Sequence, residues 1–340
     1  MRIPLLLFSY TFVILFLISC GGSGDGSTEN KSGTSEDYKK HPLINLNEKI
    51  NNDSKNDKLY IERAKYYLSI NEIDSAFRDI FIAIDINDQD PGHFNTLSDI
   101  YLVLGNPDKC KDALDKALKI DPNNKQAIQK LAELYLILQD YDKTYETVNK
   151  ALEADNFNPI AYYIRGFALL EQADTLGAID ALKMAVYQDQ GFYDAYLQLG
   201  LIFSALQNPL AAEYFNTAIN ISPESLEPYY NLGLYYQENG QVKKAISTYR
   251  MILEMQPHHV NTIYNLGYIN LVYVQDFETA IGFFTEVIQI EPSYAGAYYN
   301  RGYTYEMLGK NNLAREDYKK TLEIETNYTK AIDGLNRLDR

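Results

Sequence analysis

The sequence contains few of the residues that usually bind metals or form disulfides. Its 340 residues include only two cysteines and four histidines. Cys20 and Cys110 lie far apart, and the chain has no C-x-x-C pair and no cysteine–histidine cluster with zinc-binding spacing. The adjacent His258 and His259 follow Pro257 in a predicted turn, where side chains are usually solvated. We therefore expect no disulfide framework, no bound metal and no cofactor.

Catalytic motifs and an excess of basic residues are also missing. No G-x-S-x-G, H-E-x-x-H or P-loop motif stands in a suitable context, so we do not expect an enzyme. The chain carries 31 Lys and Arg against 46 Asp and Glu, a formal net charge of -15. A surface this negative repels phosphate backbones, whose neutralisation dominates nucleic-acid affinity. Nucleic acids and small-molecule substrates are thus not expected as partners.

The N-terminus has the pattern of a secretory signal. Arg2 and an apolar run from Leu5 to Ile18 match a charged n-region and a short h-region, and the run is shorter than the about 20 residues of a spanning helix. It ends in LISC, which resembles the lipobox of bacterial lipoproteins, where cleavage leaves a lipidated cysteine as the first residue. The resemblance implies a signal peptide over 1–19 and an acyl chain on Cys20. A plain secretory signal and a short uncleaved anchor stay open as alternatives.

Residues 20–41 are rich in Gly, Ser and Asp, and within them Gly21 to Asp37 have no apolar residue larger than glycine and cannot bury apolar surface. They predict a flexible tether with a mean span of about 25 Å. Because glycine and not aspartate follows Cys20, the lipoprotein resemblance implies the outer membrane. We expect a lipid-anchored protein of the bacterial envelope, with its periplasmic or surface face left open.

One aromatic octet recurs along the rest of the chain. YYNLGLYY at 229–236 returns as IYNLGYIN and YYNRGYTY, with fainter copies upstream, at a spacing near 34 residues that indicates a repeat architecture. Counted from the first residue of each repeat, position four is large, position eight is small and position eleven is mostly aromatic. This i, i+4, i+7 stripe predicts a packed helix. A second helix carries a small residue near its start, where Cys110 is interpreted as buried and unreactive.

This pattern resembles the tetratricopeptide repeat (TPR) and covers nearly all of the chain after the tether. The resemblance implies an all-α fold, a right-handed α-solenoid of about eight helix pairs. A half-repeat is expected at 42–56 and a C-terminal capping helix at 329–340. The eight repeats are predicted at 57–90, 91–124, 125–158, 159–192, 193–225, 226–259, 260–294 and 295–328.

Positions five, nine and twelve lie off the packing stripe, on the face that TPR arrays turn toward their concave groove, and position six adds to this candidate binding face. Positions five and nine turn apolar in four repeats, and position six carries amides, which can pair with a peptide group. Some superhelical TPR proteins hold peptides through a comparable asparagine ladder, so the resemblance implies a concave peptide-binding groove. Its expected residues are Tyr163, Phe167, Gln198, Tyr230, Asn231, Leu234, Tyr264, Asn265, Tyr268, Tyr299, Asn300 and Tyr303.

Two other interpretations of this face stay open. The tyrosines can simply pack neighbouring first helices, with asparagine as a neutral surface residue, or the face can join two copies of the chain. With the groove interpretation, we expect a non-catalytic, lipid-anchored scaffold or adaptor that binds protein or peptide partners, similar in design to outer-membrane TPR lipoproteins. The alternative is a structural subunit of an envelope secretion, motility or cell-wall assembly complex.

Overall fold

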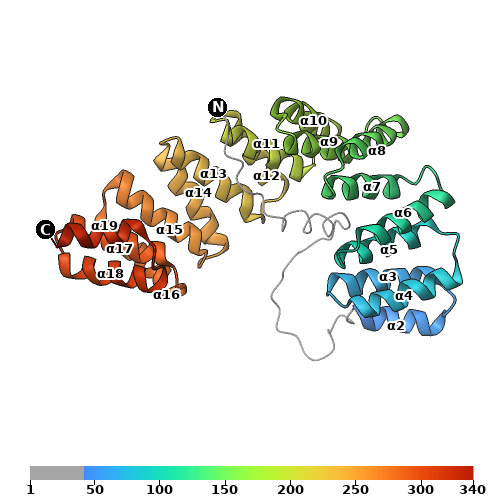
Figure 1. Ribbon diagram of the computed structural model, residues 1–340, viewed down its shortest axis with the longest axis horizontal. Coiled ribbons are helices and arrows are strands. Elements are labelled where there is room, and N and C mark those ends of the chain that lie inside the picture. Colours follow the sequence, from blue (N-terminus) through green and yellow to red (C-terminus); the bar gives the residue numbers. More distant parts are fainter. Residues whose placement is uncertain (1–41, 340) are drawn as a thin grey trace. The chain divides into compact units, whose positions relative to one another are not determined.

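The computed structural model describes residues 42–339, and these fold into helices joined by short turns (Figure 1). The predicted all-α, paired-helix fold is confirmed. The expected signal peptide, Cys20 and the tether lie outside the described residues. Within the described part, every helix is too short or too polar to cross a bilayer. The chain divides into an N-terminal part that ends at Gln188 and a C-terminal part that begins at Asp189, and each is described by itself.

The N-terminal part consists of one leading helix and four helix pairs. Each first helix packs on its own second helix, and α3, α5, α7 and α9 also contact one another in sequence order. The helices are α2 (Pro42–Asn52), α3 (Asp57–Ser69), α4 (Ile73–Ile86), α5 (Pro91–Val103), α6 (Pro107–Ile120), α7 (Lys125–Ile137), α8 (Tyr141–Ala154), α9 (Pro159–Glu171) and α10 (Thr175–Gln188).

The C-terminal part has four more pairs and ends with a single helix that packs on α17 and α18. Figure 1 shows the pairs following one another toward the C-terminus. The elements are α11 (Tyr193–Ala205), α12 (Leu210–Ile221), α13 (Leu226–Glu238), α14 (Val242–Met255), α15 (Val260–Ile269), the π-helical turn η1 (Asn270–Val274), α16 (Phe277–Ile290), α17 (Ala295–Met307), α18 (Asn311–Ile324) and α19 (Thr329–Leu338).

The turn that follows every first helix of the eight pairs contains a residue with positive φ. Such a left-handed residue closes a helix C-terminus, and glycine adopts it at the lowest cost. Only three of the eight are glycine, so five turns hold a residue that disfavours this conformation. The residues are Asn71, Gly105, Gln139, Ala173, Gln207, Gly240, Gln275 and Gly309.

The seventh repeat is one residue longer than the usual 34, and η1 accommodates the extra residue. A π-helical turn inserts a residue without breaking the helix. It moves the left-handed residue of this repeat to Gln275, one position later than in the other repeats. Val272, Tyr273 and Val274 are 43%, 43% and 49% exposed. We call these three residues the η1 patch.

The core lies between the two helices of each pair, where a large side chain covers the small residue at position eight. At Gly233 an added Cβ would lie 2.4 Å from Cε1 of the Tyr249 ring. Gly200 and Phe215 repeat this contact one pair earlier, and Cys110 is buried as expected. Burial raises the pKa of the Cys110 thiol to about 12, which makes it a poor nucleophile.

Candidate functional site

The tyrosines at position five of the C-terminal part are built into ring clusters. Each packs on an aromatic residue of its own second helix and on an aromatic residue that precedes the next first helix. The two centroid distances are 6.2 and 5.8 Å for Tyr230 (to Tyr249 and His259), 5.8 and 5.0 Å for Tyr264 (to Phe284 and Tyr294), and 5.9 and 5.1 Å for Tyr299 (to Tyr318 and Tyr328). These tyrosines therefore join successive repeats.

The asparagines at position six complete the same junctions. Asn265 Nδ2 donates to the hydroxyls of Tyr230 at 3.2 Å and Tyr249 at 3.3 Å, and Asn300 Nδ2 donates to the Tyr264 hydroxyl at 2.7 Å. Asn265 is 9% and Asn300 6% exposed. A buried amide that lost these partners would carry a desolvation cost of about 1–3 kcal/mol. The asparagine of one repeat thus fixes the tyrosine of the repeat before it.

This arrangement corrects the expectation that a row of open amides faces a ligand. Asn265 and Asn300 donate within the chain, because the repeat period brings a tyrosine hydroxyl of the preceding repeat within reach. Gln198 and Tyr163 are also buried, at 7% and 6% exposed. Asn231 is partly exposed, and its Nδ2 donates to the backbone carbonyl of Glu227. At position five, Tyr230, Tyr264 and Tyr299 pack neighbouring helices, as the first of the two other interpretations expected.

Position nine differs, because Leu234, Tyr268 and Tyr303 stay partly exposed on α13, α15 and α17. The Tyr303 ring stacks on Tyr299, with centroids 6.3 Å apart and planes 14° apart. The Tyr268 ring meets Tyr273 of the η1 patch at 6.4 Å. We call Leu234, Tyr268 and Tyr303 the position-nine row. The sequence analysis missed the η1 patch, although the extra residue of the seventh repeat was a signal for it.

The tyrosine hydroxyls at the junctions are neutral hydrogen-bonding groups. Burial raises the pKa of Tyr249 and of Tyr264 above the usual value for tyrosine. The Tyr249 hydroxyl also donates to Gln237 Oε1 at 3.2 Å. These hydroxyls therefore act as structural hydrogen-bond donors and acceptors near neutral pH.

The same positions in the N-terminal part are mostly polar. Asn95 is 2% exposed and donates to side-chain oxygens of Asn124 and Gln126. Burial raises the pKa of Asp99, which pairs with Lys130 at 2.5 Å. Tyr163 and Phe167 belong to α9 of this part, with ring centroids 4.7 Å apart, and Phe167 is partly exposed. The aromatic surface is therefore most extensive in the C-terminal part.

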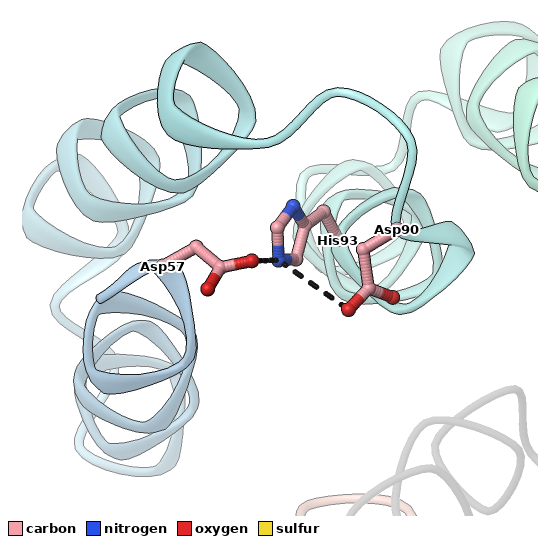
Figure 2. A group of neighbouring side chains, drawn as sticks. All are labelled: Asp57, Asp90 and His93. Atoms are coloured by element: carbon pink, nitrogen blue, oxygen red, sulfur yellow. Dashed lines mark ion pairs between the residues drawn. The ribbon is translucent and has the colours of Figure 1, made fainter. Parts of the chain in front are cut away.

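A second cluster was missed by the sequence analysis, which expected no metal ligands. Asp57, Asp90 and His93 place one donor atom each within 4.8 Å of one another (Figure 2). The His93 side chain is 1% exposed. The repeat period was the signal, because Asp57 opens the first repeat, Asp90 closes it and His93 lies at the start of the second.

Comparison with known proteins agrees with the fold. Models described as tetratricopeptide repeat match residues 94–124, 214–247 and 283–316. The C-terminal part of a TPR repeat-containing protein from Cytophaga hutchinsonii superposes with a TM-score of 0.61 at 22% identity, covering 71% of this chain and 99% of that one. MamA matches at 30% identity with a TM-score of 0.42, covering 47% of this chain and 94% of that one.

A curated relative matches over a shorter stretch. Protein O-mannosyl-transferase TMTC3 from Homo sapiens is 28% identical over 126 residues, which are 36% of this chain. The matched stretch is only 14% of the length of that protein. The similarity therefore does not extend a transferase activity to this chain.

Proposed function

Because this chain is a tetratricopeptide-repeat protein, we propose that it is a non-catalytic, lipid-anchored scaffold of the bacterial envelope. In this proposal it binds polypeptide segments of partner proteins through the position-nine row of its C-terminal part. The row itself is the observation that supports the proposal. Leu234, Tyr268 and Tyr303 present one partly exposed apolar side chain in each of three successive repeats.

The ring contact of Tyr303 favours recognition, because it orders one member of the row. Tyr303 stacks on Tyr299, which itself packs on Tyr318 and Tyr328. Aromatic anchors that are already ordered lose little side-chain entropy on binding. If neighbouring first helices are about 10 Å apart, a polyproline II segment, which rises about 3.1 Å per residue with three residues per turn, places every third side chain on the next repeat. A linear segment with apolar residues at that spacing is the expected ligand.

Contact between two copies of the chain is the second candidate, and the η1 patch favours it. Val272, Tyr273 and Val274 expose three consecutive apolar residues next to Tyr268. Exposed apolar patches also mark subunit contacts. Sedimentation of the purified wild type and of Tyr273→Asp measures the oligomeric state. Self-association that Tyr273→Asp abolishes supports contact between copies, and a monomeric wild type supports a groove for other proteins.

The proposed binding is tested with a triple variant, Leu234→Ala, Tyr268→Ala and Tyr303→Ala. Proteins captured by the wild type are identified, and synthetic segments of them are titrated by fluorescence anisotropy. We expect the triple variant to bind at least about tenfold more weakly, since each truncated anchor costs on the order of 1 kcal/mol. The matched control is Met251→Ala, Met255→Ala and Leu313→Ala, which removes exposed apolar side chains from second helices. Equal affinity of the triple variant and the wild type would refute the proposed surface.

The lipid anchor is tested at the two cysteines. Cys20→Ala is expected to abolish acyl labelling and to release the protein from envelope membranes, because a thiol at residue 20 is the proposed attachment point. Cys110→Ala is the matched control and should label as the wild type does, since Cys110 is 2% exposed. Membrane retention of a labelled Cys20→Ala protein would show that the lipoprotein interpretation is wrong.

A further inference from the structure

Two repeats of the N-terminal part meet at a small polar cluster. Asp57 is the first residue of α3, Asp90 caps the N-terminus of α5, and His93 lies in the first turn of α5. Figure 2 shows the His93 ring between the two aspartates, with one ring nitrogen facing both carboxylates. His93 Nε2 lies 3.1 Å from Asp57 Oδ2 and 3.9 Å from Asp90 Oδ2.

The hydrogen bond of His93 Nδ1 determines whether Nε2 presents a hydrogen or a lone pair to the aspartates. His93 Nδ1 is 2.8 Å from the backbone carbonyl oxygen of Asn87, and a carbonyl oxygen only accepts. Nδ1 therefore carries a hydrogen, and in the neutral ring Nε2 is left with its lone pair. Nε2 is fully buried and has no hydrogen-bond partner. Two carboxylate oxygens lie within 4 Å of this nitrogen, and a positively charged ion between the three atoms would stabilise them.

We propose that Asp57, Asp90 and His93 bind one divalent transition-metal ion, and that zinc fits these donors best. Zinc holds imidazole nitrogen and carboxylate oxygen at about 2.0–2.2 Å, so donors around a tetrahedral ion are about 3.3–3.6 Å apart. The two distances of 3.1 and 3.9 Å from Nε2 lie on either side of this range. All three donor atoms lie within 4.8 Å of one another, so rotation of the two aspartate side chains brings them to the spacing that zinc requires.

The surroundings of the cluster suit a bound metal. Metal-bound histidines usually donate their other N–H to a backbone carbonyl, as Nδ1 does here. Two carboxylates balance the charge of a divalent cation. The nitrogen donor and the small number of ligands disfavour calcium and magnesium, which require oxygen ligands in larger numbers or keep several waters. The Asp90 side chain is 33% exposed, which leaves a side for entry and for a water ligand.

A metal at this site would tie the first repeat to the second. Asp57 comes from α3, while Asp90 and His93 come from α5, so the ion would bridge the N-termini of two first helices. A ligand that binds only the folded chain stabilises it by mass action. Zinc is thus expected to raise the unfolding temperature of the N-terminal part.

The test compares zinc binding by the full chain and by three variants. The chelator-treated protein is titrated with zinc chloride by calorimetry. We expect one ion per wild-type chain, an affinity at least about tenfold weaker for Asp90→Asn, and no specific binding by His93→Gln. Asp90→Asn should fold normally, because an asparagine side chain can still cap α5 through the oxygen that accepts from Gly92 N–H at 2.8 Å. His258→Gln changes an exposed histidine and should bind as the wild type does.

Two results would overturn the proposal. A wild type that binds no zinc would show that Asp57, Asp90 and His93 only connect the two repeats and hold no ion. Equal zinc affinity of the wild type and Asp90→Asn would place any bound zinc on other surface carboxylates. A melting temperature that rises with zinc in the wild type, and rises less in Asp90→Asn, supports the site independently of the calorimetry.

Discussion

Replacement of Tyr249 by alanine is expected to lower the free energy of unfolding of the C-terminal part by about 3–5 kcal/mol. Tyr249 is fully buried on α14. Its ring covers Gly233 and lies 6.2 Å from the Tyr230 ring, and its hydroxyl accepts from Asn265. The substitution removes this packing and leaves a cavity where two repeats meet. Urea unfolding followed by circular dichroism measures the change.

Tyr249→Phe separates the ring from the hydroxyl. It keeps the packing, and Asn265 keeps its hydrogen bond to Tyr230. The lost hydroxyl makes two hydrogen bonds, with Asn265 and with Gln237, so the expected loss is about 1–2 kcal/mol at roughly 1 kcal/mol for each. If Tyr249→Phe and Tyr249→Ala were equally destabilising, the hydroxyl would make the main contribution to stability, and the explanation by ring packing would be wrong.

Gly233→Ala is expected to destabilise the C-terminal part by about 1–3 kcal/mol, although alanine has the higher helix propensity. The new Cβ would lie 2.4 Å from the Tyr249 ring, so a fully buried side chain must move. Gly282→Ala is the matched control, since no atom lies within 4 Å of its added Cβ on α16. That control should gain about 0.5–1 kcal/mol from helix propensity. The two substitutions are thus expected to change stability in opposite directions.

A double-mutant cycle tests the reason for this difference. In the Tyr249→Ala background the space above Gly233 is empty, so Gly233→Ala should no longer cost stability. The expected interaction free energy is about 1–3 kcal/mol, in the range measured for residues in contact. An unchanged cost of Gly233→Ala in that background would show that the strain comes from another neighbour.

The helix pairs follow from local sequence, and for this reason they could be predicted. The spacing near 34 residues and the stripe at positions four, eight and eleven depend only on residues within one repeat. The helix ends are less visible in the sequence. Asn71, Gln139 and Ala173 adopt the left-handed conformation that Gly105 adopts more easily, so no glycine marks these turns in the sequence.

The candidate site could be predicted only in part, because the partner of a polar group is set between repeats. An amide can pair with a ligand's peptide group or with a tyrosine hydroxyl. The positions of Asn265 and Asn300 in the sequence are compatible with either partner. The structure brings Tyr230 and Tyr264 to these amides. The peptide-binding role of this face stays a prediction, now centred on the position-nine row.

The sequence by itself determined the repeat, the two helices within it and the small residue that each pair needs at position eight. These features depend on hydrophobic period and side-chain size, which are local. Only the tertiary structure decided which polar groups meet across repeats, such as Asn265 with Tyr230 and His93 with Asp57. Hydrogen bonds and metal coordination require donor atoms to be placed within a few tenths of an ångström, and that placement exists only once neighbouring repeats have packed.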